Sequence, residues 1–213
     1  MYKRQILKSV GFSEFTDRLA HRASKDLIEV IEFLPMDPAE RKEGGFPGGL
    51  FRVGVGVFWT ALREDGPLRM NRMEESRPIV NECHISNWLV PETRCWGNAN
   101  TAFHSAEDAS AALVGPGLGW LDTFANHEWA LSLLQRRNWE LFWCYPMMRG
   151  YGASSSSRRL IYIAYLKHLL GDIAESEEYI RRAELAIHAW YFDHLHMRYR
   201  AWIDRVKLRL REL

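Results

Sequence analysis

The stretch from Gly44 to Trp59, GGFPGGLFRVGVGVFW, constrains the fold more than any other part of the chain. In an extended conformation Val53 and Val55 would face one side of its second half, and Gly54 and Gly56 would face the other. A glycine on one face of a strand commonly lets another element approach closely. The stretch therefore predicts a glycine-rich turn that leads into a β-strand.

A phosphate-binding loop is the alternative interpretation of the six glycines in this stretch. A Walker-type loop needs a Lys and then a Ser or Thr after its last glycine, because the ammonium and hydroxyl groups contact phosphate and magnesium, and neither follows here. The dinucleotide fingerprint needs a third glycine where Trp59 stands, followed by a helix. The strand is therefore preferred, and it leaves this stretch without a recognisable chemical role.

The first 90 residues contain further extended patterns. The sequence predicts a short helix over 2–10 that ends at Gly11, one helical turn over 37–40, and three more strands, over 13–23, 26–34 and 79–90. The strand over 26–34 is apolar enough to be covered on both faces. Because the connections between the strands are shorter than helical crossovers, the four strands are expected to form an antiparallel sheet.

In the second half of the chain, the spacing of apolar residues changes from that of strands to that of helices. Ser105 to Asp108 resembles a capping box that opens an alanine-rich helix, GPGLG at 115–119 is interpreted as a connector, and 121–137 has helical spacing. We therefore predict an α+β fold, in which an antiparallel sheet of about four strands is backed by helices and followed by a C-terminal helical hairpin with a long final helix.

The hairpin has the clearest signals in the chain. Gly171 is expected to end its first helix in a left-handed conformation, Asp172 to cap the second, and Glu175 to complete a reciprocal capping box. Apolar residues at steps of three or four from Ile187 to Leu213 indicate one apolar stripe that reaches the C-terminus, either on a continuous second helix or on a helix that bends near His194. The predicted organisation is a sheet domain over 1–149, a linker over 150–157, and a hairpin over 158–213 packed on the sheet domain.

The elements that carry a family resemblance are a short helix ending in Gly11-Phe12, the strand VIEF at 30–33, the strand FRVGVGV at 51–57, and Glu82-Cys83. The order of these predicted elements resembles an uncharacterised bacterial family, domain of unknown function 4304. The resemblance covers about two thirds of the chain and treats 64–77 as an insertion. It implies a fold, and it brings no catalytic residues with it. The hairpin is similar to a single tetratricopeptide-type unit, and one copy cannot form a repeat groove.

Charge and cysteine content limit the partners and the cellular location that the sequence predicts. The formal net charge of +1 gives no overall attraction to nucleic acid or to an anionic membrane. The chain has three cysteines, Cys83, Cys95 and Cys144, which include no Cys-x-x-Cys pair and are not the even number that a set of disulfides needs. This indicates reduced thiols and a cytoplasmic location. No apolar run is long enough for a signal peptide or a membrane span, so a membrane partner is not expected.

Candidate catalytic and metal-binding residues each have a structural interpretation. Neighbours on a strand point to opposite faces, so Cys83 and His84 are not expected to form a thiolate–imidazolium pair. The spacings among His188, His194 and His196 do not place them on one helix face, and His127-Glu128 lacks the second His of a zinc-protease helix. We therefore predict no metal and no cofactor.

Two segments have the composition of a binding surface. The segment FWCYPMMRGY at 142–151 combines aromatic residues, Met and Arg, which are typical of interface anchors. Its predicted protein-binding residues are Trp143, Tyr145, Met147, Arg149 and Tyr151. The C-terminal helix has a basic face that could bind an anion such as a phosphate backbone or an acidic protein, and its residues are Arg198, Arg205 and Arg209.

These observations favour a non-enzymatic protein-binding module, most specifically a bacterial immunity-type protein that neutralises a toxin. One alternative is an enzyme with a site in the cleft between sheet and hairpin, marked by converging carboxylates, His127 or Cys144. A second alternative is nucleic-acid binding through the basic C-terminal helix. The identity of the partner and the oligomeric state stay open.

Overall fold

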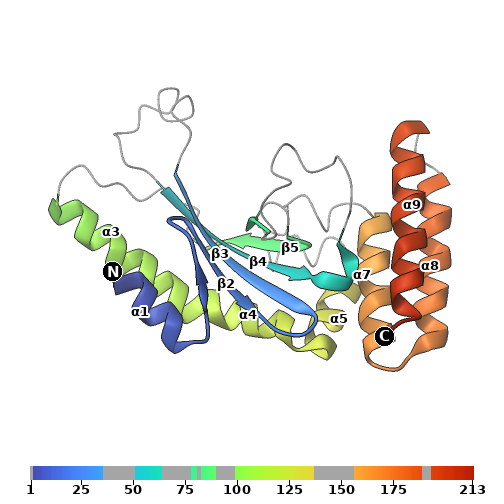
Figure 1. Cartoon of the computed structure of the whole chain (residues 1–213), viewed down its shortest axis with the longest axis horizontal. Coiled ribbons are helices and arrows are strands. Elements are labelled where there is room, and N and C mark those ends of the chain that lie inside the picture. Colours follow the sequence, from blue (N-terminus) through green and yellow to red (C-terminus); the bar gives the residue numbers. More distant parts are fainter. Residues whose placement is uncertain are drawn as a thin grey trace.

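A computed structural model of the chain describes residues 2–35, 51–63, 78–80, 83–89, 99–136, 156–188 and 193–213 (Figure 1). The strands are β1 (Glu14–Phe15), β2 (Leu19–Ala23), β3 (Leu27–Pro35), β4 (Phe51–Trp59) and β5 (Ile85–Trp88). The helices are α1 (Tyr2–Ser9), α3 (Ala99–Ala112), α4 (Leu118–Ala125), α5 (His127–Gln135), α7 (Ser156–Leu169), α8 (Ile173–His188) and α9 (Asp193–Leu210). Two short turns are the 3₁₀ helix η1 (Thr60–Leu62) and the π-helical η3 (Leu113–Gly117).

The five strands form one antiparallel sheet in the order β1-β2-β3-β4-β5, which confirms the α+β class. The sheet has one strand more than expected because the segment predicted as a single strand over 13–23 turns back on itself. At this turn the Thr16 hydroxyl oxygen accepts the backbone N–H of Leu19 at 3.0 Å. The last strand is shorter than predicted, since β5 begins only at Ile85.

Both faces of the central strands are covered. Ile31 and Val55, which are paired across β3 and β4, belong to the main core on the face that α1, α3 and α4 cover (Figure 1). Val30 and Phe58 face the other way and pack with Val80 and Cys83. The prediction of a strand over 26–34 that is buried on both sides is therefore confirmed.

An ion-pair network ties the sheet to the helical layer. Arg22 pairs with Glu29 on the neighbouring strand and with Asp122 of α4, the latter at 2.9 Å. Arg22 also donates to the carbonyl oxygen of Val10 at 2.8 Å. The hydrogen bond with Glu29 is the main cause that raises the pKa of Arg22, so this guanidinium stays charged and holds β2, β3, α1 and α4 together.

The middle helices differ from the predictions in three places. The helix α3 begins at Ala99, so Ser105 lies inside it and does not cap it. The expected connector GPGLG is helical, because η3 continues α3 with Pro116 inside a π-helical turn. The predicted helix over 121–137 is divided at Asn126, whose side chain accepts the N–H of Trp129 at 3.0 Å and caps α5.

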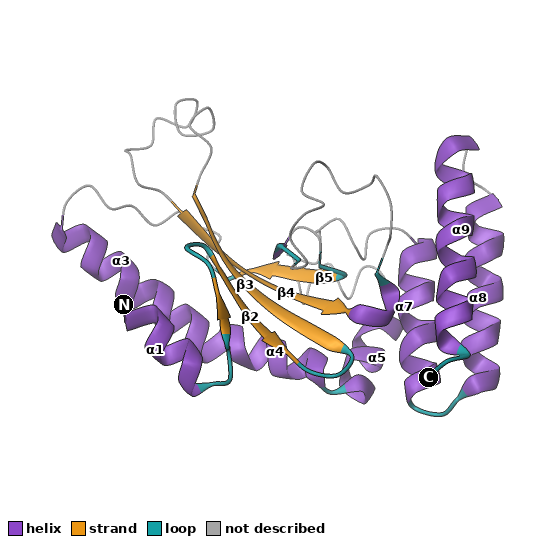
Figure 2. Ribbon diagram, in the orientation of Figure 1, coloured by secondary structure: helices purple, strands orange, loops and turns teal. Residues whose placement is uncertain are grey.

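The C-terminal helices form a separate layer, with α7 on the inside (Figure 2). Every side chain of α7 from Ile161 to Leu166 is buried, because α5 and the sheet lie on one side of α7 and α8 and α9 lie on the other. The helix α7 begins at Ser156, and the rest of the predicted linker lies outside the described residues, as does the turn predicted over 37–40.

The predicted turn between α7 and α8 is confirmed in its backbone. Gly171 has a φ of 82°, and Asp172 accepts the N–H of Glu175 at 3.4 Å. The prediction of a reciprocal hydrogen bond from the Glu175 side chain to the N–H of Asp172 is wrong. The Glu175 carboxylate pairs with Lys167 at 2.6 Å, and the N–H of Asp172 donates to the carbonyl oxygen of Lys167. Lys167 thus draws both acidic residues of this turn toward α7.

The structure decides between the continuous and the interrupted final helix, which the sequence left open. The helices α8 and α9 are distinct and lie side by side in antiparallel orientation, so the chain reverses between His188 and Asp193 (Figure 1). Lys207 of α9 pairs with Glu184 of α8, which fixes the register of the two helices. The C-terminal unit is therefore a three-helix arrangement with α8 and α9 on its outer side.

Candidate functional site

The predicted protein-binding residues Trp143, Tyr145, Met147, Arg149 and Tyr151 lie outside the described residues, and so does Cys144. Their role stays a prediction. The side chains of His188, His194 and His196 are also outside the described part. Among the side chains that are described, no group of three or more His, Cys, Asp or Glu is placed to hold a metal ion.

The predicted basic face of α9 is only partly available for an anion. Arg209 donates from Nη1 to the carbonyl oxygens of Ala61 and Arg63, each at 3.0 Å. These carbonyls lie at the end of η1, where a cation is favourable because the last carbonyls of a helical turn have no partner within it. Arg205 is partly buried, and the side chain of Arg198 lies outside the described part. Arg209 therefore anchors α9 to the end of β4.

The junction between the sheet and the C-terminal helices is filled by aromatic side chains. The ring of Trp59 lies 5.7 Å from that of Tyr162 and 5.8 Å from that of His84. The backbone N–H of Trp59 donates to Nδ1 of His84, so the proton of this imidazole is on Nε2, which lies 3.2 Å from the Leu62 carbonyl oxygen and donates to it. Trp202 of α9 donates to the same carbonyl oxygen at 3.1 Å. The described part of this junction is packed core.

Cys83 and His84 lie at a bend before β5 and not on the strand that the sequence predicted for them. The thiol of Cys83 is buried and donates to the Ile79 carbonyl oxygen at 3.4 Å. Both ring nitrogens of His84 are engaged by the backbone of β4 and η1. Neither residue is arranged as half of a nucleophile–base pair.

A His–carboxylate pair lies near this junction. Nε2 of His127, at the start of α5, lies 3.2 Å from Oδ2 of Asp26 in the turn between β2 and β3, and each side chain is 27% exposed. The buried hydroxyl of Tyr165 has no hydrogen-bond partner among the described residues, and its pKa is raised by burial first and by the charge of Asp26 second. The sequence indicated His127 but not its partner, because the two residues are far apart in the chain.

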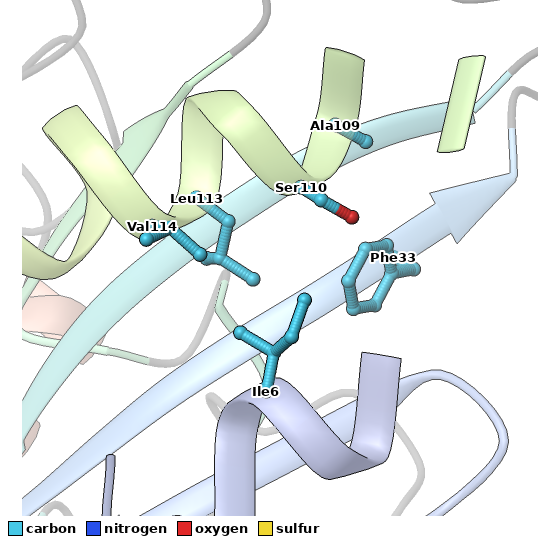
Figure 3. Close-up of a pocket in the computed structure, with 6 residues that line it drawn as sticks. All are labelled: Ile6, Phe33, Ala109, Ser110, Leu113 and Val114. Atoms are coloured by element: carbon cyan, nitrogen blue, oxygen red, sulfur yellow. The ribbon is translucent and has the colours of Figure 1, made fainter. Parts of the chain in front are cut away.

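A small hollow lies between α1, β3, α3 and η3 (Figure 3). Its volume of about 10 Å³ is roughly the room that one water molecule needs. Ile6, Phe33 and Leu113 point toward one another across it, from α1, β3 and η3 (Figure 3). The lining is apolar except for Ser110, and it contains no titratable side chain.

Exposed apolar side chains gather on the C-terminal helices. Eight large apolar side chains are exposed in the described part of the chain, and six of them belong to residues 156–213. These six are Leu170, Ile173, Leu185, Met197, Leu208 and Leu213. Helical spacing alone could have identified Leu185, since it lies opposite the buried face formed by Ile180, Ala183 and Ile187.

The chain gives no significant match to protein-family models, to curated proteins or to solved structures. The resemblance to domain of unknown function 4304 therefore stays a prediction. None of the helices in the described ranges is both long enough and apolar enough to cross a membrane.

Proposed function

We propose that this protein is a non-enzymatic protein-binding module of bacterial type, which acts in the cytoplasm and, in its most specific form, neutralises a toxin by binding it. The observation that supports this proposal is the concentration of exposed apolar side chains on the C-terminal helices. Exposed apolar patches commonly mark sites of protein interaction, and the C-terminal helices hold six of the eight large exposed apolar side chains in the described part of the chain.

The binding surface of this proposal is the outer face of α9, defined by Met197, Arg200, Ala201, Asp204, Leu208 and Arg211. All six are exposed, with Met197 at 69% and Leu208 at 58%. Successive steps of three or four residues along α9 place them on the side opposite its buried face. Met and Arg are enriched in protein interfaces, and because the two Arg side chains outnumber Asp204, the face favours a partner with an acidic surface.

The test begins with capture of the partner from cells that produce the protein. Wild type and the variants Met197→Asp and Leu208→Asp serve as baits, and Leu185→Asp is the matched control because Leu185 on α8 is equally exposed, at 58%. The proposal expects a stoichiometric partner that both α9 variants lose and the control keeps. Expression of this partner alone should arrest growth, and co-expression of the wild-type protein should restore it.

The immunity role is contradicted when the wild-type protein leaves the arrest unchanged. A partner that binds the two α9 variants as tightly as it binds wild type contradicts the α9 surface while leaving protein binding itself intact. Circular dichroism of each variant separates loss of binding from loss of folding.

The pair of Asp26 and His127 favours an enzyme as the second candidate function. A carboxylate that holds one nitrogen of an imidazole leaves the other nitrogen to act as a general base, and both side chains reach solvent. Hydrolysis of nitrophenyl esters and phosphates by wild type, lost in His127→Gln and reduced in Asp26→Asn, would support this function. Equal rates for wild type and His127→Gln would contradict it.

A further inference from the structure

The helix α8 carries an outer stripe whose sequence is symmetric in charge. The stripe consists of Ala174, Glu177, Glu178, Arg181, Arg182 and Leu185, all of which are exposed. Steps of three and four residues place them on one face, opposite the side that packs on α7 and α9. The stripe extends over three turns, about 17 Å at the rise of an α-helix.

The symmetry is centred between Tyr179 and Ile180. Glu178 and Arg181 lie at equal distances from this point on its two sides, and so do Glu177 and Arg182. Two such helices placed antiparallel would set Glu178 of each against Arg181 of the other, and Glu177 against Arg182. Leu185 of each copy would meet Ala174 of the other, so that a large exposed side chain faces a small one.

We propose that this protein self-associates into a twofold dimer through antiparallel packing of α8 against α8 of a second copy. In a twofold interface the same patch contacts itself, so a self-complementary pattern is what such an interface requires. A parallel arrangement would set Glu against Glu and Arg against Arg, which like-charge repulsion disfavours. The charges therefore specify the orientation of the two helices.

The other carboxylates of α8 are already neutralised within one chain. Glu175 pairs with Lys167 of α7, and Glu184 pairs with Lys207 of α9. The antiparallel arrangement would bring Glu175 of one copy near Glu184 of the other, and these two lysines remove the repulsion between them. The charges left for the interface are two Glu and two Arg from each copy.

The arginines of the stripe are already oriented in the single chain. Arg181 donates through Nε and Nη2 to Glu178 at 2.9 and 2.8 Å, and the guanidinium of Arg182 lies 4.8 Å from the centre of the Tyr179 ring. An arginine has five N–H donors, so Arg181 can keep its bond to Glu178 while it donates to the Glu178 of a second copy. The intrahelical pairs would then join into one network across the twofold axis.

The dimer is expected to be weak and sensitive to salt. Exposed ion pairs contribute little individually and are screened at physiological ionic strength, and a contact three turns long buries a small area. Leu185, which is 58% exposed in the single chain, supplies the apolar anchor. We expect a dissociation constant in the micromolar range or weaker that rises with added salt.

Analytical ultracentrifugation over about 10–500 μM protein at low salt tests the proposal, since this range covers weak transient association. Wild type should shift from monomer toward dimer across the range. Glu178→Arg alone and Arg181→Glu alone should each weaken association about tenfold or more, because each creates two like-charge contacts per dimer. Leu185→Asp should weaken it as well, and Met197→Asp on α9 should leave it unchanged.

Two rescue measurements make the test specific for antiparallel α8. The double variant Glu178→Arg/Arg181→Glu restores opposite charges at every contact and should dimerise like wild type. An equimolar mixture of the two single variants should form a heterodimer, although neither variant associates with itself. Far-ultraviolet circular dichroism confirms that each single variant keeps its helices, so loss of folding is distinguished from loss of association.

A wild-type protein that stays monomeric at the highest concentration in low salt overturns the proposal. So does a dimer that both single charge reversals leave intact, since association would then use another surface. The proposal does not rest on the protein-binding function, because it uses α8 and the other uses α9. Loss of a partner in Met197→Asp without a change in dimerisation separates the two.

Discussion

At the scale of single residues, Gly56 shows how closely two elements approach. A Cβ placed on Gly56 would lie 2.5 Å from Sγ and 2.7 Å from Cβ of Cys83, so the segment before β5 rests directly on the backbone of β4. Gly119 in α4 is the opposite case, because a Cβ placed there meets no atom of the described residues within 4 Å outside its own turn of helix. Close packing therefore requires glycine at position 56, whereas the space around position 119 would admit a side chain.

We predict that Gly56→Ala lowers the free energy of unfolding by about 1–3 kcal/mol, the usual cost of overpacking a tight site. The matched variant Gly119→Ala should be neutral or stabilising by up to about 1 kcal/mol, since alanine is the better helix former. Urea denaturation of both variants measures the difference. Equal stability of Gly56→Ala and wild type would show that Cys83 moves aside at little cost.

Single contacts are also where the sequence was least informative. Alternation along β4 correctly placed Gly56 on a face that another element approaches, yet nothing in the pattern identified Cys83 as that neighbour. The pair of Asp26 and His127 was missed for the same reason, since a contact between a strand turn and a helix start depends on how the layers are placed. The local spacing of apolar residues does not indicate which residues far apart in the chain are in contact.

At the scale of elements, the turn between α7 and α8 combines backbone geometry with charge. Its glycine and its cap were predictable, because their effects are local to the turn. The reversal before α9 was not, since Ile187, Tyr191, Leu195 and Tyr199 keep helical spacing across it. An apolar stripe indicates which face is buried and does not indicate whether the chain continues straight or turns back.

Asp172 gives this turn a dependence on pH. The hydrogen bond from Lys167 is the main cause that lowers the pKa of Asp172 below its ordinary value of 3.8, with the N–H of Glu175 adding to it. A carboxyl group whose pKa is lowered by folding stabilises the protein at pH values above its unfolded pKa. This contribution is lost as the pH falls through the lower pKa of the folded state.

We predict that Asp172→Asn, which keeps the cap but removes the charge, lowers the melting temperature at neutral pH. The difference from wild type should shrink as the pH falls below 3.8 and Asp172 becomes protonated. Thermal denaturation between pH 2 and pH 7 measures it, with Asp204→Asn on the exposed face of α9 as the control. A difference that is constant over this range would contradict a role for the charge.

At the scale of the whole molecule, the sheet and the C-terminal helices share one core. The helix α7 is buried from both sides, and three side chains join the two parts through backbone carbonyls. Arg159 donates to Leu134 and Arg136 at the end of α5, Trp202 donates to Leu62, and Arg209 donates to Ala61 and Arg63. Burial is the main cause that lowers the pKa of Arg159, which is consistent with its place between α5 and α7.

The sequence predicted the α+β class and a helical C-terminal part, because both follow from the change of period along the chain. It also suggested a linker at 150–157, where small polar residues separate two periodic segments. Composition does not indicate how much surface two segments bury against each other. The side chains from Ile161 to Leu166 are apolar around the whole helix, a pattern that is typical of a helix buried on all sides.

We therefore predict that the two parts unfold together. Urea denaturation followed by tryptophan fluorescence and by helical circular dichroism should give coincident transitions, as expected for a single cooperative unit. Trp202→Phe removes the N–H donor to Leu62 and should lower the common midpoint by an amount equivalent to about 1–3 kcal/mol, because it leaves a buried carbonyl with one donor fewer and a smaller ring in the junction. Two separated transitions in wild type, or a Trp202→Phe effect confined to the helical signal, would show that the C-terminal helices fold independently of the sheet.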